Sequence, residues 1–183
     1  MIVTKSLQVA VVSSFMVAAC GIAMAADTGL SPADRAFVAK AAQGGLMEVA
    51  AGKLAAQRGL DPAVKEFGQK MVTDHTAAND KLKSLADSKQ MMLPDSVSPE
   101  ENAALGKLEA LNGADFDKTY SQMMVKDHVE DISEFEKEVK KGQDADVKSF
   151  AENTLPTLQH HLMLANRLSS QQKKSSSTPT KSP

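Results

Sequence analysis

The sequence predicts an all-helical domain, and three observations support this. From Ser31 onward apolar residues recur every three or four positions, which is the repeat of a helix with one buried face. Almost no segment alternates polar and apolar residues as a half-buried strand does. The chain of 183 residues is 42% hydrophobic and 24% charged and has one cysteine, a composition typical of one globular domain without a disulfide framework.

The first 25 residues have the layout of a secretory signal peptide. A single charge at Lys5 precedes an apolar stretch, and small residues at 23–25 offer a cleavage point. A competing cut lies before Cys20, because residues 17–20 resemble the lipobox of bacterial lipoproteins, whose cysteine becomes a lipid anchor. Both interpretations export the domain, so we expect it in the periplasm or associated with the outer membrane. No later stretch is long and apolar enough to span a bilayer.

The first helical hairpin is expected between residues 31 and 89. Its first helix should run to about Arg58, because Ser31 and Pro32 are typical of a helix start and Gly59 of a helix end. Its second helix should begin at residue 61 and carry one apolar stripe to about residue 89.

A second hairpin is expected after a connector over residues 91–113. The connector contains two prolines and a short helical stretch at 100–111. The third helix should span about residues 115–142, and the fourth about residues 144–168, because apolar residues keep the helical repeat through both segments.

Two hairpins joined by a long connector predict a ferritin-like four-helix bundle with one long crossover between helices two and three. An internal repeat supports this arrangement, because residues 67–75 match residues 120–128. We expect the bundle over residues 31–169 and a disordered tail, rich in Ser, Lys, Thr and Pro, over residues 170–183. The net charge of −2 disfavours nucleic acid as a partner.

Three of the four histidines are expected to face the core, because a helix turns about 100° per residue. His75 and His128 lie on the apolar stripes of the second and third helices. On the fourth helix His161 tends inward and His160 outward. Counted from the turns, His128 and His161 differ in depth by about 7.5 Å, little more than one helical turn.

Two carboxylates extend this set to a candidate metal site. Glu48 and Asp131 share helix faces with core residues, and together with the three inward histidines they could meet in the middle of the bundle. Imidazole nitrogen and carboxylate oxygen from facing helices are ligands for Zn, Cu, Mn or Fe.

Four further residues are expected to surround the ligands. Asp74 and Asp127 precede two of the histidines and are expected either to face solvent or to accept hydrogen bonds from imidazole N–H groups, and not to bind the metal. Met71 and Met124 each lie one turn before a histidine. A thioether there suits copper, although methionine is also common packing material in helical cores.

Three functions remain open from these residues. The first is a non-enzymatic envelope protein that binds a transition metal. The second is a structural or stress-related module whose buried His and Asp side chains form a metal-free hydrogen-bonded network. The third, a metal-dependent oxidoreductase, needs an open coordination position and a substrate route that no motif indicates. No nucleophile elbow or phosphate-binding glycine loop is present, so no catalytic residue is assigned.

A set of motifs is spread over residues 31–168: Phe37-Val38, Ala41-Ala42-Gln43-Gly44-Gly45, Glu48-Val49, Met71-Val72-x-Asp74-His75, Phe116-Asp117-x-x-Tyr120, Met124-Val125-x-Asp127-His128 and Leu155-Pro156-x-Leu158-x-x-His161-Leu162. Together they resemble the bacterial domain of unknown function 4142. The resemblance implies a ferritin-like bundle exported to the cell envelope, and it supplies no established activity. One departure from di-iron ferritin-like proteins matters, because the chain contains no Glu-x-x-His motif. The nearest analogue, His128-x-x-Asp131, has the reverse order, so a mononuclear site fits better.

Overall fold

A computed structural model describes residues 29–176 of the chain, with side chains to residue 174. All regular structure in this part is helical and contains no strand, which confirms the predicted all-helical class. The predicted signal peptide and Cys20 lie outside the described residues. The helices are α1 (Pro32–Arg58), α2 (Pro62–Ser88), α3 (Pro99–Glu109), α4 (Gly113–Lys141) and α5 (Ala145–Ser176).

The first three helices begin in the same way. A polar residue caps each amino end and proline follows it: Ser31 accepts from the backbone N–H of Asp34, and Asp61 accepts from that of Ala63. Ser98 forms a capping box with Glu101 at the start of α3. These caps satisfy amide groups that the first turn of a helix leaves without partners.

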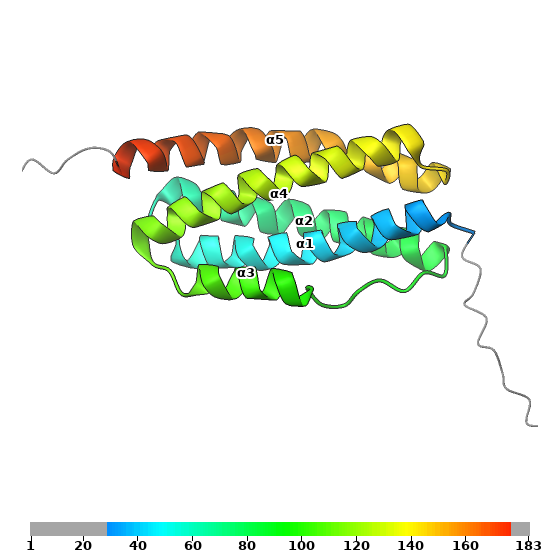
Figure 1. Cartoon of the computed structure of the whole chain (residues 1–183), viewed down its shortest axis with the longest axis horizontal. Helices are drawn as coiled ribbons and strands as arrows, with labels where there is room; N and C mark the ends of the chain where they lie inside the picture. Colours follow the sequence, from blue (N-terminus) through cyan, green and yellow to red (C-terminus); the bar gives the residue numbers. More distant parts are fainter. Residues whose placement is uncertain (1–28, 177–183) are drawn as a thin grey trace, which may run out of the picture.

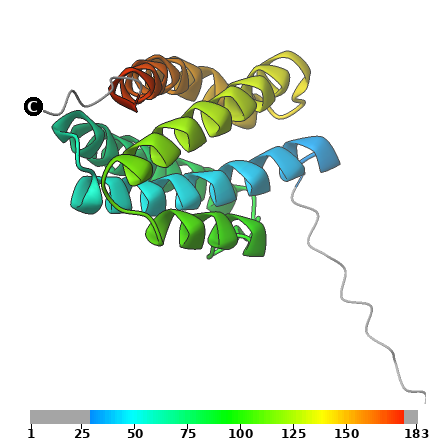
Figure 2. The same ribbon diagram turned by 60° about the vertical axis from the view of Figure 1, so that its left-hand side comes forward.

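The four long helices lie alongside one another, and α3 runs along the outer side of α1 (Figure 1). The pairs α1–α2 and α4–α5 pack as hairpins, and α2 also contacts α5 while α1 contacts α4. Figure 2 shows the same layers from the side, with α3 beside α1. Among the described helices, none combines the length and apolar composition needed to cross a membrane.

Glycines allow α1 and α2 to approach very closely. A Cβ atom placed on Gly68 would lie 2.7 Å from the carbonyl oxygen of Gly52 and 2.7 Å from the backbone nitrogen of Ala56. Backbone atoms cannot turn aside as side-chain ends can, so these glycines set the distance between the two helices.

The last helix is longer than the sequence predicted. We expected it to end near residue 168 and a disordered tail to begin at residue 170, whereas α5 continues to Ser176. Gln172 is buried in this extension, and its side-chain amide donates to Asp61 at the start of α2 over 3.3 Å. Contact with α2 therefore holds the extra turns, although their composition is typical of a tail.

Two buried aspartates connect the hairpins crosswise. Asp34, in the first turn of α1, accepts hydrogen bonds from the backbone N–H groups of Gln143 and Asp144 between α4 and α5. Asp117, near the start of α4, accepts from those of Leu60 and Asp61 between α1 and α2, over 2.9 and 2.7 Å. Each hairpin therefore supplies the acceptor that satisfies the turn of the other hairpin.

Glu138 lies in the same end of the molecule as Asp34. Burial, reinforced by the neighbouring carboxylate of Asp34, raises the pKa of Glu138 from 4.5 to about 7. A carboxyl group with a raised pKa favours the folded state while it is protonated. Its contribution to stability is therefore complete below pH 4.5 and is lost as the pH rises through about 7.

The substitution Glu138→Gln is expected to raise Tm by about 2–4 °C at pH 8 and to change it little at pH 4.5. The neutral amide keeps the shape of the side chain and carries no charge beside Asp34. Solvent near the helix end screens part of the repulsion between the two carboxylates, so we expect a smaller rise in Tm than the full pKa shift would give. Thermal unfolding followed by circular dichroism checks this, with the exposed Glu66→Gln as the control. An equal change in Tm at both pH values would contradict the predicted role of the Glu138 charge.

Candidate metal centre

A polar layer divides the core of the bundle. One apolar cluster contains Phe67, Met71, Tyr120 and Met124, and a second contains residues such as Leu82 and Phe135. Along α2 and α4 the inward histidines follow the first cluster and precede the second; on α5 the order is reversed.

His75 on α2, His128 on α4 and His161 on α5 come together in this layer. All three are buried, with exposed fractions of 5%, 0% and 0%. Their ring centroids lie 5.2 to 5.7 Å apart, a nearly equilateral triangle. Each ring offers one nitrogen such that the three atoms lie within 4.8 Å of one another, so the cluster could hold a metal ion.

One nitrogen of each ring lies within 2.9 Å of an oxygen acceptor. His75 Nδ1 lies 2.8 Å from Glu48 Oε2, and His161 Nε2 lies 2.8 Å from Asp74 Oδ2. His128 Nδ1 lies 2.9 Å from the carbonyl oxygen of Met124. Because a carbonyl or a carboxylate accepts, these ring nitrogens donate, and the other nitrogen of each neutral ring carries a lone pair.

Those other nitrogens are His75 Nε2, His128 Nε2 and His161 Nδ1, and all three are buried without a hydrogen-bond partner. Buried polar atoms normally have partners, so three such atoms in one layer indicate a ligand. An ion held at about 2.0–2.1 Å from three imidazoles needs nitrogens about 3.3 Å apart in tetrahedral geometry. The clustered ligand atoms lie within 4.8 Å of one another, so the rings would have to move closer together to bind an ion. The residues therefore fit a bound transition metal.

The electrostatics of the layer keep the rings neutral. Burial lowers the pKa of His75, His128 and His161 from 6.5 to about 4. Metals bind the neutral imidazole, so no proton needs to leave the rings at pH 7. Burial has the opposite effect on the carboxyl group of Glu48, whose pKa rises from 4.5 to about 7.

Glu48 and Asp131 were expected to complete or to orient the ligand set, and the cluster of side chains that could hold an ion contains only the three histidines. Glu48 is 2% exposed and contacts the Nδ1 atoms of two rings, His75 at 2.8 Å and His128 at 3.4 Å. It therefore lies behind the rings and orients them. Asp131 is half-buried beside Gly44 of α1, and burial raises its pKa to about 8.

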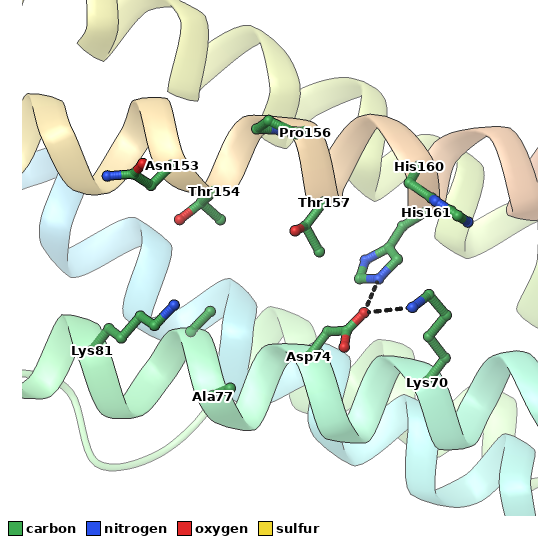
Figure 3. Close-up of a pocket in the computed structure, with 11 residues that line it drawn as sticks. Lys70, Asp74, Ala77, Lys81, Asn153, Thr154, Pro156, Thr157, His160 and His161 are labelled. Carbon is green, nitrogen blue, oxygen red and sulfur yellow. Dashed lines mark hydrogen bonds and ion pairs between the residues drawn. The ribbon is translucent and has the colours of Figure 1, made fainter.

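The four surrounding residues have different positions. Asp74 accepts from His161 and also forms an ion pair of 3.0 Å with Lys70, as Figure 3 shows. Asp127 lines a cavity between α1, α3 and α4, and the carbonyl group of Met124, not Asp127, accepts from His128. Met71 and Met124 are buried in the first apolar cluster.

Two groups that hold the site in place were not predicted from the sequence. The carbonyl group of Met124 orients His128, and side-chain patterns carry no signal for a backbone acceptor. Lys70 holds Asp74 in place, and its spacing of four residues from Asp74 on one helix is a signal that could have identified it.

Two cavities and one narrow cleft surround the layer. A cavity of about 450 Å³ between α2 and α5 includes His161 and Asp74 in its wall (Figure 3). A second cavity, of about 670 Å³, includes Glu48 and is lined by α1, α3 and α4. The cleft that includes His75 has room for only about 20 Å³, about one water molecule.

Comparisons with known proteins agree with this architecture. The sequence profile of the family described as domain of unknown function DUF4142 matches residues 21–168. The structure is similar to the crystal structure of a DUF305 fragment from Deinococcus radiodurans, with a TM-score of 0.66 and 13% sequence identity, covering 78% of this chain and 98% of that one. At that identity the similarity shows the fold alone. No curated protein matches the chain.

Proposed function

The chain belongs to the DUF4142 family, whose description assigns no activity, and from the histidine cluster we propose that it binds one divalent transition-metal ion. The ligands are His75 Nε2, His128 Nε2 and His161 Nδ1. The single observation that carries the proposal is that each buried ring has one nitrogen held by an acceptor and the other without a partner.

The surroundings of the rings support a metal site over a metal-free network. In proteins that bind metals, the second nitrogen of a ligating histidine donates to a carboxylate or a carbonyl group. Glu48, Asp74 and the carbonyl of Met124 provide those acceptors. In a closed network of His and Asp groups the remaining nitrogens would also have partners.

The three imidazoles favour Zn, Cu or Fe over Mg or Ca, which prefer oxygen ligands. We propose binding and not catalysis, because the three unpartnered nitrogens are buried and no motif in the sequence identifies a catalytic residue. The bound ion would act as a Lewis acid, and this chain's own side chains hold the rings neutral and exclude bulk water.

We further propose that the protein is exported to the cell envelope and has a ferritin-like architecture, as the sequence predicted. The four long helices would form a ferritin-like four-helix bundle in which α3 lies in the long crossover. The packing of α1 on α2, α4 on α5, α2 on α5 and α1 on α4 supports this. The exported location rests on the first 25 residues, with lipidation of Cys20 as the alternative to simple cleavage.

Elemental analysis of the mature protein, purified without a histidine tag, tests the metal site. After reconstitution with Zn, Cu, Mn or Fe in turn, we expect one ion per chain with at least one of these metals. The variant His75→Ala/His128→Ala should retain none. Tm should fall on addition of a chelator in the natural protein and not in the variant. A natural protein without metal after all four reconstitutions would leave the metal-free network as the explanation.

A further inference from the structure

The cavity between α1, α3 and α4 is lined by more acidic than basic side chains. Three lysines reach it, Lys40, Lys107 and Lys126. Two of them form ion pairs, Lys126 with Glu130 of the cavity wall and Lys40 with Glu134. The acidic residues of the wall are Glu48, Glu100, Glu101, Asp127, Glu130 and Asp131.

Glu48 connects this cavity with the histidine cluster. One of its oxygens, Oε2, contacts His75 at 2.8 Å. The other, Oε1, is buried without a hydrogen-bond partner, although the residue lines the cavity and is only 2% exposed. It lies 3.4 Å from His128 Nδ1, which already donates to a backbone carbonyl. Glu48 therefore borders both the cavity and the rings.

Asp127 provides a second oxygen of the same kind. Its Oδ2 atom is buried without a partner, and the residue precedes His128 directly on α4. Asp131 follows one turn later on the same helix and also lines the cavity. Burial raises the pKa of both carboxyl groups, to about 6 for Asp127 and to about 8 for Asp131, so a cation that binds Asp131 at pH 7 would have to displace a proton.

The cavity on the opposite side of the cluster has the other polarity. Lys70, Lys81 and His160 line the space between α2 and α5, with Asp74 as its only acidic residue in the described wall. Figure 3 shows both lysines along α2, with Lys70 directed at Asp74. A cation that approaches the rings is therefore favoured from the side of α1, α3 and α4.

We propose that the acidic cavity between α1, α3 and α4 is an uptake site, in which Asp127 and Asp131 bind a hydrated divalent cation that then passes Glu48 to reach the histidines. Hydrated divalent cations bind carboxylate oxygens while they keep part of their water, and imidazole nitrogens hold a transition metal once that water is lost. The transfer step rests on the proposed metal site; the binding of cations in the cavity does not.

The rate of metal uptake tests the transfer step. Stopped-flow absorbance follows Co²⁺ binding to the natural protein, to Asp127→Asn/Asp131→Asn and to the control Glu66→Gln/Asp115→Asn, which removes two exposed carboxylates outside the cavity. We expect uptake at least tenfold slower in the cavity variant and an unchanged rate in the control. The final Co²⁺ content, measured in the same samples, separates slow uptake from a lost site.

Binding in the cavity itself is tested without the histidines. In the His75→Ala/His128→Ala background, electron paramagnetic resonance of free Mn²⁺ should show binding that disappears when Asp127→Asn/Asp131→Asn is added. An unchanged Co²⁺ rate in the cavity variant would overturn the uptake site and leave the metal site standing. The opposite result is Mn²⁺ binding that depends on Asp127 and Asp131 in a protein whose histidines do not take up Co²⁺. That result would overturn the metal site and the transfer step, and it would support the cavity as a cation site.

Discussion

Replacing His161 by alanine is expected to lower the affinity for a divalent transition metal by more than about 100-fold, since losing an acceptor behind a ligand already costs 10–100-fold. The ring is fully buried and provides one of the three unpartnered nitrogens. His160 offers a matched control, because it is the adjacent residue and its side chain is exposed. His160→Ala should therefore bind metal with unchanged affinity.

Competition with a chelating dye at pH 7 measures both affinities. The two variants have the same composition, so a difference between them reports the position of the imidazole and not the number of histidines. Unfolding in denaturant without metal is measured in parallel, to show that His161→Ala is folded. Equal metal affinity in the two variants would contradict the assignment of His161 as a ligand.

Gly68→Ala is expected to destabilise the fold by about 3 kcal/mol or more. Overpacking a tight core typically costs about 1–3 kcal/mol, and here the added methyl group would lie 2.7 Å from backbone atoms of α1 that no rotamer change can move. The two helices must separate, which also loosens the contacts of neighbouring apolar side chains such as Met71.

Gly106→Ala on α3 is the control for this substitution. Nothing lies within 4 Å of a Cβ atom at Gly106, and alanine favours a helix interior over glycine, so this change should stabilise by about 0.5–1 kcal/mol. Urea unfolding of both variants provides the comparison. Similar effects for the two glycines would mean that helix propensity, and not the close approach of α1 and α2, decides the cost.

Much of the fold could be predicted because periodicity acts over many residues. Repeats of three and four residues located the long helices, and the caps at Ser31 and Asp61 located two of their starts. The end of α5 could not be predicted, because residues after Leu168 are equally suited to a helix and to a solvated tail. The contact of Gln172 with Asp61, which lies far away in the sequence, decides between them.

The candidate site could also be predicted in part. The angle of 100° per residue is a local property, and it placed His75, His128 and His161 on inward faces. Counted along straight helices, the depths of His128 and His161 differed by about 7.5 Å. The packing of the helices brings all three rings to within 5.7 Å of one another. The role of Glu48 depends on the distance between α1 and its neighbours, which no pattern within one helix contains.

The crosswise bonds of Asp34 and Asp117 have a consequence for the order in which the chain folds. Until α4 is present, the amide groups of Leu60 and Asp61 lack their acceptor, and until α1 is present those of Gln143 and Asp144 lack theirs. Neither half of the chain is therefore complete as a folding unit. The amino-terminal half of a growing chain should remain loosely structured until its carboxyl-terminal half is present, and the two halves should then fold in one cooperative step.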